Sequence, residues 1–132
     1  MNAFAETPIN QFLGLQLMQS NSEGGKVVLS DCAHLTQEGG VVHGGILSTL
    51  ADTAAVYAVI PHLADGASMT SIEFKMNFFR PGRAGGGELV ATAKILKAGR
   101  TVNVCESKVM QGEKELAHGV FTYLVMANPE TL

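Results

Sequence analysis

The clearest pattern in the chain is a long apolar helix between Gly44 and Ile60, directly ahead of Pro61. Apolar residues recur there at i, i+3 and i+4 spacing, and together they cover most of the helix surface. These positions are Ile46, Leu47, Leu50, Ala51, Ala54, Ala55, Ala58 and Val59. A helix with so little polar surface is predicted to be buried, so the rest of the chain must wrap around it.

The chain after this helix has the pattern of a β-sheet. Residues 72–78 alternate apolar and polar side chains with a period of two. Turn residues separate three further predicted strands, over residues 88–96, 101–110 and 115–126. The connections after Arg80 are short, which predicts antiparallel neighbours, because a parallel crossover needs a dozen or more residues.

The chain before the long helix is predicted to add a short helix and a hairpin. Pro8 suits the first turn of a helix with Thr7 as its N-cap, and Gly14 is placed to end it. Two extended runs then flank the turn residues 21–25. The predicted fold is α+β, with one long helix packed on a curved antiparallel sheet, in a single domain spanning residues 1–132.

Composition and charge exclude several classes of protein. The 132 residues are 46% apolar and 16% charged, which fits one globular domain and not a disordered chain. A net charge of −3 and a pI near 5.7 argue against a general nucleic-acid or anionic-membrane binder, which would carry a basic field. Cys32 and Cys105 lack CxxC spacing, which favours reduced thiols, and the scattered histidines favour no metal site.

The N-terminal sequence has no basic start followed by an apolar core, so no secretory signal is predicted. The longest run without Asp, Glu, Lys or Arg extends from Thr7 to Ser22 and is too short and too polar to span a bilayer. We therefore expect a cytoplasmic protein.

Asp52 is the first residue of the long helix that needs a chemical explanation. Aspartate is unfavourable inside a helix, because its side chain competes for backbone hydrogen bonds. A carboxylate among apolar neighbours is also costly to desolvate without a partner. One interpretation is a narrow polar stripe that Asp52 shares with Ser48, Thr49 and Thr53. The other is a carboxylate held for catalysis, where such costs are tolerated.

Gly44 and Gly45 begin the same helix. The first amides of a helix have no internal partner and point outward at the positive end of its dipole. Two glycines leave these N–H groups open to a close ligand, an arrangement that can polarise a carbonyl and stabilise an oxyanion. A simple glycine turn into a helix is the alternative. No phosphate loop is predicted, since the Lys and Ser/Thr that follow its glycines are absent.

The spacing of these two features limits how they can act together. Asp52 follows Gly44 by eight residues, which is ~12 Å along a helix axis. One helix cannot bring both groups to the same reacting carbonyl. If both act on one bond, they come from two helices that run antiparallel across a dimer.

A family resemblance rests on four segments: Gln37, His43-Gly44-Gly45, Leu50-Ala51-Asp52 and Phe78-Phe79-Arg80-Pro81. Together they resemble the signature of hotdog-fold acyl-CoA thioesterases, in the phenylacetate-degradation (PaaI-like) branch, over about residues 35–126. The resemblance implies a hotdog fold and a homodimer or homotetramer built as a dimer of dimers. It also implies hydrolysis of an acyl- or aryl-CoA thioester to the free acid and coenzyme A. No cofactor is implied, because coenzyme A is part of the substrate.

The resemblance also implies roles for single residues. Asp52 corresponds to the family's catalytic carboxylate, and Gly44 to the residue whose backbone N–H polarises the thioester carbonyl. Gln37 corresponds to a Gln or Asn that helps to hold the carbonyl or the water. Gly45 is expected to line the substrate site. His43 corresponds to a positioning histidine at the helix mouth, with a plain hydrogen bonder at the helix entry as the alternative.

Hydroxyl groups orient water in some relatives of this family. Ser71, or its neighbour Thr70, falls near one position where such a hydroxyl is found. A second such position, one turn after the carboxylate, is Val56 in this chain, so no water-orienting role is expected there.

Four basic residues, Arg80, Arg83, Lys97 and Arg100, occur at predicted turns. Together they are candidates to bind the phosphates of coenzyme A. The alternative is that they are solvated turn residues with no ligand.

The sequence thus predicts an acyl-CoA thioester hydrolase in which Asp52 acts as general base or as nucleophile. The predicted partners are the acyl-CoA substrate and further copies of the chain, with no nucleic acid and no membrane. The alternative function is a non-catalytic acyl-CoA-binding hotdog module, a sensor or accessory subunit. A hotdog dehydratase ranks last, because the His-containing, Pro-rich loop that usually precedes the helix is absent.

Overall fold

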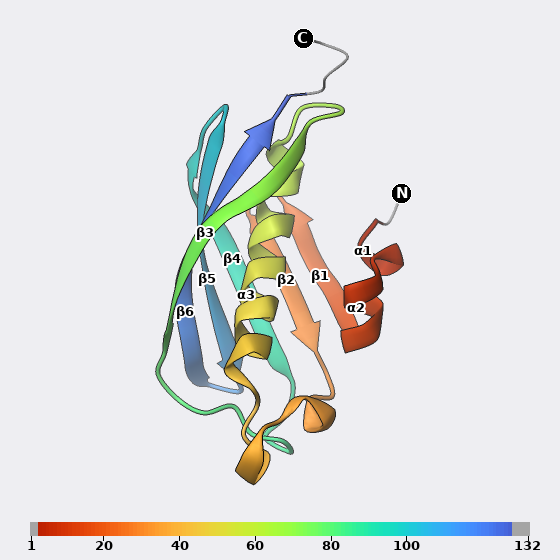
Figure 1. Cartoon of the computed structure of the whole chain (residues 1–132), viewed down its shortest axis with the longest axis vertical. Helices are drawn as coiled ribbons and strands as arrows, with labels where there is room; N and C mark the ends of the chain where they lie inside the picture. Colours follow the sequence, from red (N-terminus) through yellow and green to blue (C-terminus); the bar gives the residue numbers. More distant parts are fainter. Residues whose placement is uncertain (1–2, 128–132) are drawn as a thin grey trace.

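A computed structural model describes residues 3–127, in which a six-stranded antiparallel sheet curves around one long helix, α3 (Gly44–Val59) (Figure 1). The strand order is β1-β2-β4-β5-β6-β3. The strands are β1 (Leu15–Asn21), β2 (Gly24–Leu29), β3 (Ser68–Phe78), β4 (Leu89–Ala98), β5 (Val102–Gln111) and β6 (Lys114–Met126). The predicted α+β arrangement of a buried helix on an antiparallel sheet is confirmed.

Small side chains allow α3 to lie close to the sheet. Ala51, Ala54, Ala55 and Ala58 on its buried face have no exposed surface. Opposite them on β2 is Gly25, where a Cβ atom would collide with the backbone of α3. The absence of a side chain at Gly25 therefore sets how closely the middle of the helix approaches the strands.

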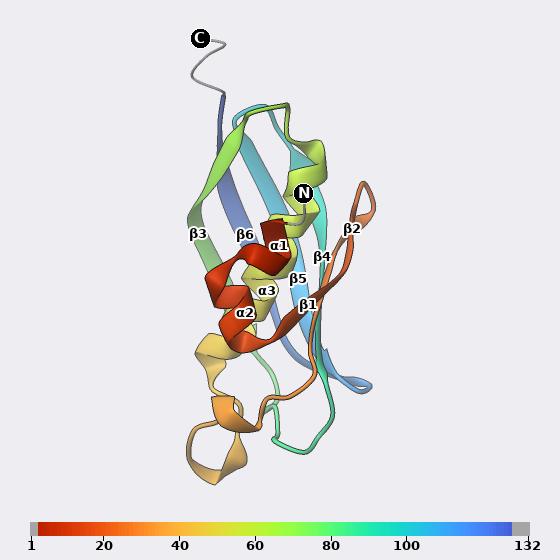
Figure 2. The ribbon, with the colours of Figure 1, turned by 90° about the vertical axis from the view of Figure 1, so that its right-hand side faces the viewer.

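The N-terminal segment packs beside α3, as Figure 2 shows. The predicted short helix is confirmed as α2 (Pro8–Leu13), with Gly14 at φ 74° as its left-handed end. Thr7 holds the N-cap position, but its hydroxyl donates to the Ala3 carbonyl and does not cap the helix. A preceding turn of helix, α1 (Ala3–Glu6), was not predicted. Its Phe4 ring meets the ring of Tyr57 edge-on at 5.1 Å, which joins this segment to α3. Short 3₁₀ turns are η1 (Ala33–Leu35), η2 (Glu38–Gly40) and η3 (Ile60–His62).

Strand β3 lies at the edge of the sheet, beside a strand that does not follow it along the chain. The short connections join β4, β5 and β6 as antiparallel neighbours, as predicted. β3 pairs with β6 instead of β4. Residues 79–88 carry the chain from this edge to the middle of the sheet (Figure 1). Three strand spacings amount to about 14 Å, which ten residues span easily.

The stretch Gly44–His62 is long and apolar enough to cross a membrane by length and composition, with a mean hydropathy of 1.3. In the fold it is the core helix α3 and the following turn η3, and side chains such as Leu50 and Val59 have no exposed surface. Its apolar character is explained by its place against the sheet. The uncharged run Thr7–Ser22 contributes to α2 and β1 instead.

Candidate active site

Asp52 lies midway along α3 and is half-buried. Its carboxylate has a partner on the sheet: the hydroxyl of Tyr123, on β6, donates to Oδ1 at 2.5 Å. The same hydroxyl lies 3.2 Å from the backbone carbonyl oxygen of Asp52. Tyr123 is only 1% exposed, so this contact is formed at the inner edge of the core. The mid-helix carboxylate is therefore held by a residue that the sequence pattern did not reveal.

The environment keeps the Tyr123 hydroxyl protonated. Burial raises the pKa of Tyr123 far above its usual range, and the negative charge of Asp52 raises this pKa further. A phenol that keeps its proton has a hydrogen to donate throughout the pH range in which proteins are stable. Tyr123 is consequently a permanent hydrogen-bond donor to Asp52.

The polar stripe considered for Asp52 exists, but its members behave differently. The Thr49 hydroxyl donates to the Gly45 carbonyl at 2.8 Å, and the Thr53 hydroxyl donates to the Thr49 carbonyl at 2.7 Å. Both threonines thus satisfy themselves on their own helix. Asp52 instead binds across to β6, so a solvated stripe does not account for its contact.

His43 caps the N-terminus of α3. Its Nδ1 atom accepts a hydrogen bond from the Gly45 N–H at 2.9 Å. The prediction that both glycine N–H groups are open is therefore wrong for Gly45. The Gly44 N–H, in the first helical position, has no hydrogen-bond partner within residues 3–127. One N–H at the helix start thus remains free to meet a ligand.

The cap determines which nitrogen of His43 carries a proton. Because Nδ1 accepts a hydrogen bond, a neutral ring must carry its hydrogen on Nε2. This contact agrees with the helix-entry alternative for His43, and the cap does not use the Nε2–H of a neutral ring. His43 itself is exposed.

Gln37 lies in the loop that leads into the helix. Its backbone N–H donates to the Val41 carbonyl at 2.7 Å, and the His43 N–H donates to the Leu35 carbonyl at 3.0 Å. These bonds fold the loop back on itself, so that Gln37 and His43 belong to one compact turn. The Gln37 side chain is exposed. The structure therefore brings Gln37 to the same end of α3 as Gly44.

The β3–β6 register distinguishes Ser71 from Thr70. Ser71 pairs with Tyr123, whose side chain faces α3, whereas Thr70 pairs with the exposed Leu124. Paired residues project to the same face of a sheet. Ser71 is consequently on the helix side, one strand away from the Tyr123 hydroxyl that binds Asp52. This placement favours Ser71 over Thr70 as the hydroxyl near the carboxylate.

The four basic turn residues do not form one cluster within a chain. Arg80 and Arg83 line a surface cavity of about 300 Å³ together with Lys114, at the end of the sheet where β4 begins. Lys97 and Arg100 lie at the other end of β4, a ten-residue strand. That strand separates the two pairs by roughly 30 Å. A single subunit therefore cannot direct all four at one group of phosphates.

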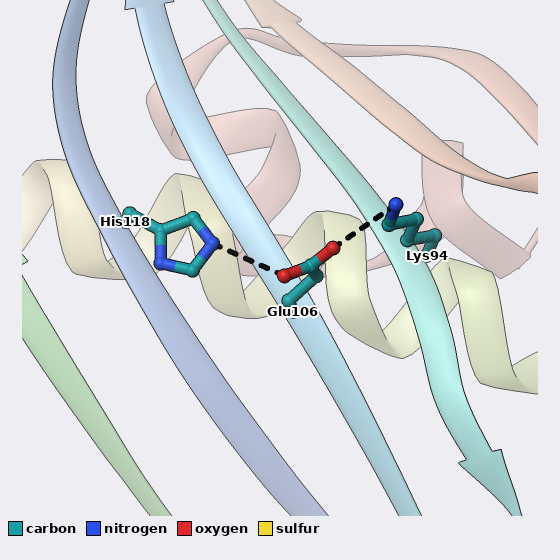
Figure 3. Close-up of polar contacts among 3 residues, drawn as sticks. All are labelled: Lys94, Glu106 and His118. Atoms are coloured by element: carbon teal, nitrogen blue, oxygen red, sulfur yellow. Dashed lines mark hydrogen bonds and ion pairs between the residues drawn. The ribbon is translucent and has the colours of Figure 1, made fainter.

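A separate charged cluster lies on the face of the sheet opposite α3 (Figure 3). Glu106 on β5 accepts from Lys94 on β4 at 3.1 Å and contacts His118 on β6 at 3.3 Å. The hydrogen bond from Lys94 is the main cause that lowers the pKa of Glu106. The buried neighbours of Glu106 in β5, Cys105 and Ser107, face the helix instead. The cluster therefore has no access to Asp52.

Metal binding finds no support in the arrangement of side chains. Within residues 3–127 no group of three His, Cys, Asp or Glu side chains is placed to hold a metal ion. That the protein needs no metal or cofactor stays a prediction.

Comparison with known proteins identifies the family. The sequence profile of the Thioesterase superfamily matches residues 39–118, which include both Gly44 and Asp52. The chain belongs to the thioesterase superfamily. A proposed esterase of Halobacterium salinarum is 34% identical over 104 residues, which cover 75% of this chain and 67% of that protein. Membership of this superfamily supports hydrolase activity.

Solved structures of the superfamily share the fold. A thioesterase family protein from Silicibacter pomeroyi aligns with a TM-score of 0.85 and 28% identity, over 95% of this chain and 93% of that one. The PaaI protein of Escherichia coli, from the phenylacetic acid degradation operon, aligns with a TM-score of 0.83 and 23% identity, over 96% and 89%. The hotdog fold that the resemblance implied is thus confirmed.

Proposed function

We propose that this thioesterase-superfamily protein is an acyl-CoA thioesterase whose reacting groups come from two subunits of a homodimer. One observation carries the proposal. α3 presents a half-buried carboxylate, Asp52, at its middle and, at its start, the N–H of Gly44, which no group in the described part of the chain accepts. The first suits a base or nucleophile, and the second suits an oxyanion.

In the proposed reaction, the thioester carbonyl oxygen accepts a hydrogen bond from the Gly44 N–H. Asp52 then acts in one of two ways. As a general base it takes a proton from water while the water oxygen attacks the carbonyl carbon. As a nucleophile it attacks that carbon itself, and water later cleaves the mixed anhydride. Both routes expel the thiolate of coenzyme A, which takes up a proton, and both yield the free acid.

Three further residues have supporting roles in this proposal. Gln37 and His43 lie at the Gly44 end of α3 and would steady the carbonyl from that side. Ser71 lies on the strand next to Tyr123 and would orient the water near Asp52. In a shared site, the first two come from one subunit and Ser71 comes from the other.

The distance along α3 supports a site shared between subunits. Gly44 and Asp52 lie on one uninterrupted helix and are eight residues apart, which separates them by ~12 Å. A hydrogen bond to the carbonyl oxygen and an attack on its carbon, either directly or through one water, require both groups close to one reacting centre, at about 3 Å for each direct contact. One chain does not meet this condition, whereas two antiparallel helices could.

The exposed edge of β3 offers the surface for such a dimer. Its residues are largely solvent-exposed, including Ile72 at 55%, Phe74 at 47% and Phe78 at 53%. A long apolar edge strand is a template for pairing with another strand. A second copy of β3 would cover this edge and extend the sheet across both subunits.

Two levels of β3 can be placed relative to α3. Phe78 lies beside the helix start, since a Cβ at Gly44 would approach its ring to 3.6 Å. Ser71 lies at the level of Tyr123 and Asp52. A second β3 running antiparallel to the first would bring the Ser71 level of one strand toward the Phe78 level of the other. Asp52 would then approach the partner's Gly44.

The same pairing would give the basic residues a common function. Antiparallel β3 strands would bring the Arg80 and Arg83 end of one subunit toward the Lys97 and Arg100 end of the other. Guanidinium groups are suited to bidentate binding of phosphate oxygens. Residues from both subunits would thus contribute to binding the phosphates of coenzyme A. We also propose that two such dimers associate to form the homotetramer.

An acyl-CoA panel tests the proposed function directly. Purified protein is assayed for release of free thiol from short, medium, long and aryl acyl-CoA substrates, with Asp52→Asn as the matched control. The proposal expects turnover of at least one substrate and its loss in Asp52→Asn. Binding without turnover of any substrate would favour the non-catalytic acyl-CoA-binding module instead.

A further inference from the structure

Tyr123 is a buried group that the proposed reaction does not use. It is the residue of β6 that reaches α3 at Asp52, and among residues 3–127 its hydroxyl bonds to no other carboxylate. A buried phenol needs a partner for its hydroxyl, which by itself would be a structural role. The geometry indicates a further role. The hydroxyl lies within reach of the Asp52 backbone carbonyl, yet its shorter hydrogen bond is to the Asp52 carboxylate.

The hydrogen bond makes the two oxygens of Asp52 different. Oδ1 accepts from Tyr123 at 2.5 Å, the short distance typical of a hydroxyl donating to an ionised carboxylate. A donor on one oxygen fixes the plane of the carboxylate and draws charge toward that oxygen. Oδ2 remains as the oxygen that can meet water or a thioester.

We propose that Tyr123 is a positioning residue, which holds Asp52 by Oδ1 and presents Oδ2 to the reacting group. This inference rests on the proposed function for its catalytic consequence. The positioning of Asp52 by Tyr123 can be tested without any activity, because it concerns only the charge and orientation of the Asp52 carboxylate.

The other ionisable side chains around Asp52 keep their protons near neutral pH. Cys105 on β5 faces the same region and donates to the Ala55 carbonyl. Burial raises the pKa of Cys105 to about 11, so the thiol stays neutral. The inward-facing residues of β2 and β4 at this helix are apolar, as at Val27 and Ala91. On α3 the nearest other ionisable side chain is Tyr57.

Tyr123→Phe removes the hydroxyl and keeps the ring. Loss of a donor to an ionised carboxylate favours its protonated form. The acid limb of the kcat/KM pH profile should move to higher pH by about one unit. At neutral pH kcat should fall about tenfold through lost orientation, with KM nearly unchanged. In the Asp52→Asn background, Tyr123→Phe should have no further effect on kcat.

The matched control is Tyr57→Phe, which removes the other tyrosine hydroxyl from the same helix region. That hydroxyl interacts with Thr7, remote from the carboxylate. The control should leave the acid limb at the same pH as in the parent protein. It should also keep kcat within about twofold of the parent value. An acid limb that stays in place in Tyr123→Phe, with kcat equal to that of Tyr57→Phe, would overturn the proposal.

NMR separates this proposal from the proposed function. Carbon-detected titration of the Asp52 carboxyl should show a midpoint about one pH unit higher in Tyr123→Phe. In the parent protein the Tyr123 hydroxyl proton should follow the ionisation of Asp52, and it should move upfield in Asp52→Asn. The hydroxyl measurement needs no Tyr123 variant to fold. If the Asp52 titration is unchanged in Tyr123→Phe and the Tyr123 hydroxyl proton does not respond to Asp52, the proposed positioning role of Tyr123 is overturned. If these resonances are coupled but the parent protein is inactive, only the thioesterase proposal is overturned.

Discussion

Replacing Gly44 with proline removes one backbone N–H from the start of α3 and little else. The Gly44 N–H has no hydrogen-bond partner within residues 3–127, so no internal bond is lost. The preceding residue, His43, has ψ 132°, the extended conformation that a residue before proline requires. Proline is also favoured at the first helical position. The folded backbone therefore accepts Gly44→Pro without rearrangement.

The expected kinetic effect is large because the missing hydrogen is the proposed oxyanion donor. Removal of one such donor costs about 10²–10³-fold in kcat, or roughly 3–4 kcal/mol of transition-state stabilisation. Stability should move the other way. Restricting the unfolded chain at a compatible site stabilises a protein by about 0.4–1 kcal/mol. We therefore expect a nearly inactive enzyme whose Tm is equal to or above that of the parent.

Gly44→Ala is the matched control, since it keeps the N–H. Its Cβ would lie 3.6 Å from the Phe78 ring, an ordinary van der Waals contact. Thiol release is measured under saturating acyl-CoA for the parent and both variants, alongside thermal unfolding. We expect Gly44→Ala to keep kcat within about threefold. If Gly44→Pro is folded and as active as Gly44→Ala, the Gly44 N–H does not stabilise the oxyanion.

Three other changes test separate parts of the structure. Asp52→Asn should lower kcat by ~10²-fold or more. It should not lower Tm, because the amide oxygen still accepts a hydrogen bond from Tyr123. Retained activity in the thiol assay would exclude Asp52 as base or nucleophile. Gly25→Ala should destabilise the protein by about 1–3 kcal/mol in urea unfolding, since its Cβ meets helix backbone; an unchanged midpoint would contradict the close packing. Glu106→Gln should cost less than about 1 kcal/mol near neutral pH. Because the pKa of Glu106 is lowered from 4.5 in the fold, this loss should shrink in Tm measurements as the pH falls below 4.5 and through the lowered pKa, and a loss that grows with acidity would refute it.

Much of the fold was predictable because its strongest signals are local. The spacing of small apolar residues such as Ala51 and Ala55 marks a helix whose face must be covered. Pro8 and Gly14 mark the ends of α2, and their roles follow from backbone geometry alone. The neighbour of β3 was not predictable in this way. Pairing between strands depends on the path of a connection through space, and residues 79–88 carry no pattern that specifies it.

In the candidate site, too, the residues with local signals were predictable and those placed by packing were not. Asp52 stood out because a carboxylate in an apolar helix conflicts with local preference. Tyr123 did not, because a tyrosine is ordinary in a strand and only the packing of β6 against α3 brings its hydroxyl to Asp52. Gly45 was expected to offer an open N–H, but the rotamer of His43 determines that it does not. The alternation of β6 could have indicated a role for Tyr123. It places Tyr123 on the inward face, where its hydroxyl needs a hydrogen-bond partner.

Mixed dimers test most directly the claim that each site combines Asp52 of one subunit with Gly44 of the other. Subunits carrying Asp52→Asn and subunits carrying Gly44→Pro are given different tags, and the dimer containing one of each is purified through both. Such a dimer has one site with both lesions and one with neither. We predict activity up to half that of the parent dimer, although each variant alone is nearly inactive. Absence of recovery in folded mixed dimers would contradict a site shared between subunits.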